Sequence, residues 1–158
     1  MQVSTAQSLE EVRKKFHLAV IDPNQSCSFH QYIHEIPANT PTLQAYQAVA
    51  EAMIAQNVWN PFAKLNQLHR FHDFISEAIL TEPENIEIRF LRFAVEFYTP
   101  RILSMSDNLL EDRDMILENL KELTHMNLDP DFALSLPFVS GFSPPTPCCD
   151  CDDDNLLL

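Results

Sequence analysis

The 158-residue sequence contains a single glycine, Gly141. Tight β-hairpin turns and phosphate-binding loops both rely on glycine, because glycine adopts positive φ angles at little steric cost. An all-β fold and a Rossmann or P-loop nucleotide site are therefore excluded. Hydrophobic residues make up 46% of the chain, which is enough for a substantial core and favours one folded domain.

Basic residues are also scarce, since 10 Lys and Arg stand against 23 Asp and Glu and the net charge is −13. Such a chain repels phosphate backbones and anionic lipids, so nucleic acid and membrane surfaces are poor partners. No apolar run is long enough to span a bilayer, and residues 1–6 lack the features of a secretion signal. The four cysteines do not have the spacing of a disulfide framework. We therefore expect a cytoplasmic protein.

Prolines and capping residues predict where helices begin. Thr40-Pro41 and Asn60-Pro61 each place a capping side chain before a proline in the first helical position. Ser8 and Glu11 match a capping box. Apolar residues follow at helical spacing, and short links between helices imply antiparallel neighbours. The prediction is an all-α bundle of five to seven antiparallel helices. The expected helices cover residues 8–20, 26–36, 41–58, 61–80 and 83–97, one capped by Ser106 or Asp107, and a short one at 129–134.

The composition changes at Pro137. The segment 143–147 contains three prolines, and the four aspartates within 150–154 repel each other. We therefore predict one helical domain over residues 1–136 and a mostly disordered Pro/Cys/Asp-rich tail over residues 137–158.

The segment from Ile86 to Tyr98 is apolar around most of its girth, which is typical of a helix buried on several sides. We expect it to be the hub of the fold. Apart from Glu87, the polar residues of this segment and its two flanking positions form one narrow stripe of Asn85, Arg89, Arg92, Glu96 and Thr99.

Two charges lie on apolar helix faces, Glu87 in this segment and Lys64 in the preceding one. Burying an unpaired carboxylate costs several kcal/mol, so we predict that Lys64 and Glu87 form an ion pair. The alternative is that each charge reaches solvent from a first helical turn.

The chain also resembles known helical proteins. Ala78-x4-Pro83, between two amphipathic helices, resembles the end of a tetratricopeptide-type repeat. Between about Pro41 and Leu120 the chain contains Asn60-Pro-x-x-Lys64-Leu65, Pro83-x-Asn85-x-Glu87-x-Arg89-Phe-x-Arg92-Phe93, Pro100-x-x-Leu103 and Asp112. In these residues it is similar to an uncharacterised family of small bacterial all-helical proteins. This resemblance implies a fold with a tetratricopeptide-like hairpin at its centre and carries no established activity.

Two groups of residues are candidate metal ligands. His30-x3-His34 has the spacing of helical zinc ligands, although Gln31 stands where the zinc-protease motif has glutamate. The alternative is a surface or hydrogen-bonded histidine pair. Cys148, Cys149 and Cys151 offer thiolates for zinc or copper(I), or else form an exposed, oxidisable tail.

No motif predicts catalysis, because Ser140-Gly141 lacks the nucleophile-elbow pattern. Stacked helical hairpins create concave surfaces that hold peptides. The favoured prediction is a helical interaction module, a scaffold or adaptor for a protein or peptide, which binds through Arg89, Arg92 and Trp59. One alternative is a metal-binding protein that uses the cysteine tail, with or without His30 and His34. The other is a helical carrier that guides processing of its own C-terminal segment.

Overall fold

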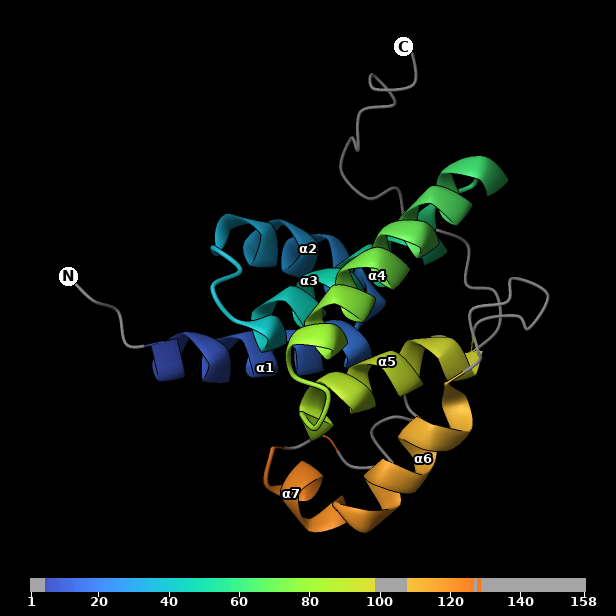
Figure 1. Ribbon diagram of the computed structural model, residues 1–158. Coiled ribbons are helices and arrows are strands. Elements are labelled where there is room, and N and C mark those ends of the chain that lie inside the picture. Colours follow the sequence, from blue (N-terminus) through green and yellow to red (C-terminus); the bar gives the residue numbers. More distant parts are fainter. Residues whose placement is uncertain (1–4, 99–107, 127, 129–158) are drawn as a thin grey trace.

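The computed structural model describes residues 5–98, 108–126 and 128, and in these residues the protein contains seven α-helices and no strand (Figure 1). The predicted all-α bundle is confirmed, whereas its likeness to a tetratricopeptide hairpin stays a prediction. The predicted tail, the helix at 129–134 and the cap at Ser106 or Asp107 lie outside the described residues. The helices are α1 (Thr5–Ile21), α2 (Ser26–Glu35), α3 (Pro41–Asn57), α4 (Pro61–Thr81), α5 (Ile86–Tyr98), α6 (Leu109–Glu118) and α7 (Leu120–His125), with a 3-10 turn at Pro23–Gln25.

The predicted capping side chains of α3 and α4 make the expected hydrogen bonds. The Thr40 hydroxyl accepts a hydrogen bond from the Leu43 N–H at 3.3 Å, and Asn60 Oδ1 accepts one from Phe62 N–H at 2.9 Å. The start of α5 differs from the prediction. Asn85 Oδ1 accepts hydrogen bonds from two N–H groups of the first turn, so α5 begins at Ile86 and Pro83 lies in the connecting turn.

The hub of the fold is α3 rather than α5. Helix α3 contacts α1, α2, α4 and α5, and most of its 17 residues are buried. Five buried alanines, between Ala45 and Ala55, allow the neighbouring helices to approach closely. Helix α5 is also largely buried, and it separates α3 from α6 and α7 in Figure 1. The apolar residues around most of the circumference of α5 predicted its burial correctly. They could not show that α3, with its shorter side chains, lies at the centre of the bundle.

Glu87 links three helices. Its carboxylate accepts two hydrogen bonds from the Arg13 guanidinium of α1, at 2.7 and 2.6 Å, and one from the Tyr46 hydroxyl of α3 at 2.7 Å. Burial and the adjacent Glu87 charge raise the pKa of Tyr46 well above its usual 10, so its hydroxyl stays protonated and donates the hydrogen bond to Glu87. The predicted partner was wrong, because Lys64 is exposed on α4 and lies beyond 4.0 Å of Glu87.

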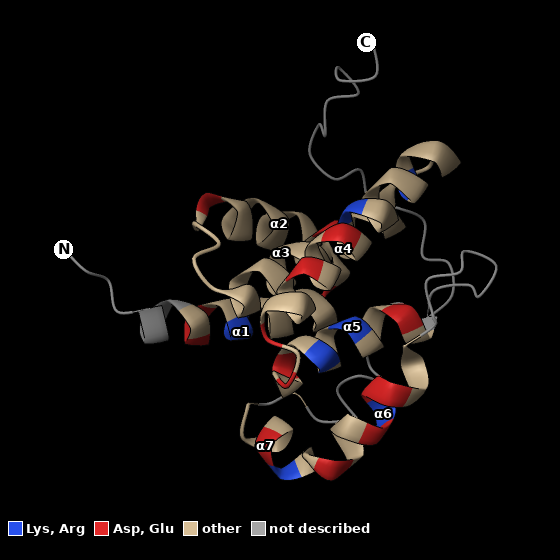
Figure 2. Ribbon diagram, in the orientation of Figure 1, with Lys and Arg blue, Asp and Glu red and all other residues tan. Residues whose placement is uncertain are grey.

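A second carboxylate, Asp112, attaches α6 to α5 and is completely buried. Arg92 donates to both of its oxygens, at 2.6 and 2.7 Å, and Arg89 donates to Oδ1 at 3.0 Å. Arg89 also donates to the Glu111 carboxylate at 2.7 Å. Figure 2 shows the two basic stretches of α5 on the side of the acidic start of α6. This corrects the prediction that Arg89 and Arg92 contact a partner, because both guanidinium groups are engaged inside the protein.

We expect Asp112→Asn to destabilise the protein by about 3 kcal/mol or more, because it leaves two buried guanidinium groups without a full counter-charge. The matched control is Asp114→Asn, which removes an exposed ion pair with Arg113 and is expected to change the free energy of unfolding by about 0.5 kcal/mol or less. Urea denaturation at pH 7 measures both. Equal effects of the two substitutions would show that Asp112 does not attach α6.

Candidate metal centre

The predicted histidine pair lies on one face of α2. The rings of His30 and His34 are 4.4 Å apart between centroids, as expected for residues one helical turn apart. The Gln47 side chain of α3 donates hydrogen bonds to the carbonyl oxygens of Ile33 and Ile36, both at 3.2 Å. These bonds satisfy carbonyl groups at the end of α2 and hold the histidine-bearing helix against α3.

Glu51 of α3 is the third member of the cluster, and sequence reasoning missed it. Its Oε1 lies 3.1 Å from Nε2 of His30 and 2.8 Å from Nε2 of His34. Glu51 is only 2% exposed, whereas the side chains of His30 and His34 are 23% and 35% exposed. A signal was present in the sequence, because Glu51 is the single charged residue in the apolar run 48–55. Like Glu87, Glu51 is a carboxylate on an apolar helix face, where burial requires a partner.

The other carboxylate oxygen of Glu51 is different. Oε2 is buried and accepts no hydrogen bond from the described residues. The nearest cation is Arg70 of α4, whose Nη1 lies 3.9 Å away, beyond hydrogen-bond distance, on a side chain that is 64% exposed. Glu87 and Asp112, by contrast, have hydrogen bonds to both oxygens. Among these three buried carboxylates, Glu51 alone retains an unsatisfied oxygen.

Glu51 is ionised at neutral pH. Burial by itself would raise the pKa of its carboxyl group, but the hydrogen bonds and charges of His30 and His34 outweigh burial and lower the pKa from 4.5 to about 2. The cluster therefore presents a permanent negative charge between two imidazoles.

These three side chains have the separations of a metal-ligand set. One ligand atom from each lies within 4.8 Å of the others, and no other group of three such residues occurs in the described part of the chain. Two ligands about 2.1 Å from a tetrahedral zinc ion lie about 3.4 Å apart. The observed Nε2–Oε1 separations of 3.1 and 2.8 Å need only a small side-chain adjustment to reach that value. The partly exposed imidazoles leave a path for an ion from solvent.

The other predicted site residues are not brought into this cluster. Trp59 lies in the link between α3 and α4 and is 79% exposed, as is the neighbouring Phe62. Cys148, Cys149 and Cys151 lie outside the described residues. Cys27 takes part in a disulfide bond, although no disulfide was expected from the cysteine spacing.

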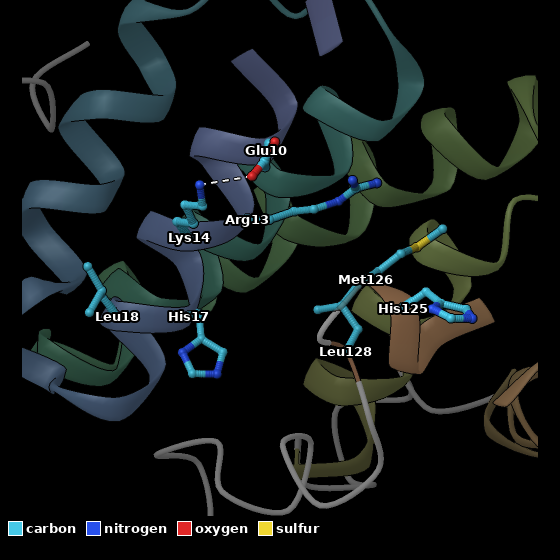
Figure 3. A pocket seen from close by; sticks show the side chains of 8 residues that line it. All are labelled: Glu10, Arg13, Lys14, His17, Leu18, His125, Met126 and Leu128. Atoms are coloured by element: carbon cyan, nitrogen blue, oxygen red, sulfur yellow. Dashed lines mark ion pairs between the residues drawn. The ribbon is translucent and has the colours of Figure 1, made fainter. Parts of the chain in front are cut away.

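A cavity of about 730 Å³ lies between α1 and the end of α7, which is the size of many ligand pockets (Figure 3). Its charged groups already have partners, because Lys14 pairs with Glu10 at 2.8 Å and Arg13 pairs with Glu87. The cavity therefore offers no lysine or arginine charge that a ligand would have to neutralise. It is lined by Glu10, Arg13, Lys14, His17, Leu18, His125, Met126 and Leu128.

No family model, curated protein or solved structure matches this chain. The resemblance to a bacterial helical family thus stays a prediction, and the geometry of the site carries the functional argument. None of the described helices combines the length and hydrophobicity that crossing a membrane requires.

We expect the ionised Glu51 to stabilise the metal-free protein in a pH-dependent way. Because its pKa is lower in the folded state, this stabilisation is complete above about pH 4.5 and is lost as the pH falls toward 2. Urea denaturation of the wild type and Glu51→Gln, treated with a chelator, measures it. Between about pH 4.5 and pH 2, the free energy of unfolding of the wild type should fall by about 3 kcal/mol relative to that of Glu51→Gln. A difference that does not vary with pH would contradict the observed hydrogen bonds.

Proposed function

We propose that this protein binds a divalent transition-metal ion, with zinc the best match, through His30, His34 and Glu51. The observation that carries the proposal is the buried Glu51 carboxylate, which faces two imidazoles and keeps one oxygen without a hydrogen bond. A buried polar atom without a partner is rare in folded proteins and calls for an explanation. A metal ion that both oxygens of this carboxylate coordinate would satisfy it.

The types of ligand favour zinc over other ions. Two imidazoles and one carboxylate form a borderline donor set that suits zinc, whereas copper(I) prefers thiolates and calcium or magnesium prefers oxygen alone. Each imidazole has to expose the lone pair of Nε2 and carry its proton on Nδ1 when the metal is bound. Because the ligands must be deprotonated, protons compete with the metal for both imidazoles.

The position of the cluster suggests what the ion does. The histidines come from α2 and the glutamate from α3, so one ion would connect two helices that are distant from the predicted cysteine tail in sequence. Any ligand that binds only the folded state stabilises it, by about 2.7 kcal/mol at a free concentration of 100 times Kd. We therefore propose a resident ion that reinforces the α2–α3 pair.

Isothermal titration calorimetry and thermal unfolding test this proposal. Zinc should bind with a stoichiometry of one and raise the melting temperature of the intact chain. Even a residue that only orients a ligand contributes about 10–100-fold to metal affinity, so His34→Ala or Glu51→Gln should weaken binding by about 100-fold or more. The matched control is His69→Ala, because His69 is an exposed histidine on α4 outside the cluster. Equal binding by wild type and His34→Ala would refute the site.

The same protein loaded with cobalt(II) separates the helical site from the cysteine tail. Ligation by imidazole and carboxylate gives visible d–d bands without the near-ultraviolet charge-transfer band of thiolate ligation. A strong sulfur-to-cobalt band that persists in His34→Ala would favour the tail instead.

We also propose, as a second candidate function, that the α3–α4 hairpin tip contacts a peptide segment. Trp59 and Phe62 are each 79% exposed on either side of the cap that starts α4. Large aromatic residues are enriched among the side chains that dominate binding energy at interfaces. The net charge of −13 favours a partner whose apolar residues are flanked by basic ones. In this second proposal Trp59 keeps its predicted role in binding a partner, whereas Arg89 and Arg92 have none.

A displayed random-peptide library tests the hairpin tip. Enriched peptides should contain apolar and basic residues, and Trp59→Ala with Phe62→Ala should weaken their binding by about tenfold or more. Leu80→Ala is the control, because Leu80 is 84% exposed at the other end of the same helix. Peptides that bind the double variant as well as the wild type would exclude this surface.

A further inference from the structure

We infer that the fourth ligand of the metal ion is an exogenous oxyanion, carboxylate or phosphate in character, which Arg70 helps to hold. This inference rests on the proposed metal site and names the class of ligand that the site takes. Three protein ligands leave the fourth position of a tetrahedral zinc ion to water or to another molecule.

The charges of the cluster favour an anion. Glu51 contributes one negative charge, and neutral imidazoles contribute none when they bind a metal. A divalent ion and Arg70 together contribute three positive charges, so the loaded site carries a net charge of +2. In a protein whose overall charge is −13, this is a local region of positive potential. An anion at the open position would reduce the repulsion between the ion and the guanidinium group.

The position of Arg70 suits this role. It approaches Glu51 from α4, whereas both histidines approach from α2. If Glu51 coordinates the ion through both oxygens, the ion lies within about 6 Å of Arg70 Nη1, a span that two oxygens of one oxyanion can bridge. The side chain is 64% exposed and makes no hydrogen bond to Glu51, so its planar set of N–H donors is available to a ligand. Halides lack the two oxygens that such a bidentate contact requires.

An oxyanion titration of the cobalt(II)-loaded protein tests the inference, with the visible spectrum as the signal. Acetate and inorganic phosphate are the two probes, and the one with the lower Kd identifies the preferred chemistry. Arg70→Ala should raise the Kd of the preferred anion by about tenfold or more, the value of one charge-assisted contact. Chloride should lose less affinity than the preferred oxyanion in the variant, because it loses the charge of the guanidinium group but no bidentate hydrogen bond. Arg113→Ala is the control, since Arg113 is exposed and pairs with Asp114.

The metal affinity provides a second readout. Removing a positive charge beside the ion should leave the cobalt Kd unchanged or lower it, whereas loss of a structural support would raise it. Tighter or equal cobalt binding together with weaker oxyanion binding in Arg70→Ala supports the inference. Cobalt binding with equal oxyanion affinity in both proteins overturns this inference and leaves the metal site intact. Absence of cobalt binding in the wild type overturns both.

Discussion

Hydrogen bonds and ion pairs to three buried carboxylates, Glu51, Glu87 and Asp112, join the helices of this structure. Glu87 draws donors from α1 and α3, Asp112 draws them from α5, and Glu51 draws them from α2. Each buried charge therefore selects which helices lie side by side. The apolar core stabilises any close packing of these helices, whereas an unmatched charge penalises every arrangement that separates it from its donors.

The partners of these three carboxylates differ, and the difference separates the structural ion pairs from the candidate metal site. Arginine saturates both oxygens of Glu87 and Asp112 in a bidentate geometry that leaves no room for a ligand. Glu51 meets imidazoles instead, which bind one oxygen and are themselves metal ligands. Glu87 and Asp112 are therefore buried with arginine on both oxygens, whereas Glu51 is buried with imidazoles on one oxygen only.

Five polar residues of the predicted family pattern, Asn85, Glu87, Arg89, Arg92 and Asp112, have physical roles in the structure. Asn85 caps α5, Glu87 accepts hydrogen bonds from Arg13 and Tyr46, and Arg89 and Arg92 hold Asp112. Together these residues join four helices, α1, α3, α5 and α6, so their roles are structural. His30, His34 and Glu51 are not among them, and the candidate site is therefore separate from these structural contacts.

The sequence by itself determined what is local. The caps at Thr40 and Asn60, the helices that follow them and the shared face of His30 and His34 depend on neighbours within one turn, and each was predictable. Which residues meet across helices was decided only by the tertiary structure. Glu87 pairs with Arg13 and not with the predicted Lys64. Arg89 and Arg92 bind the buried Asp112, and Glu51 lies beside both histidines. Helical periodicity fixes the face on which a side chain lies, but the packing of one helix on another fixes what that face contacts.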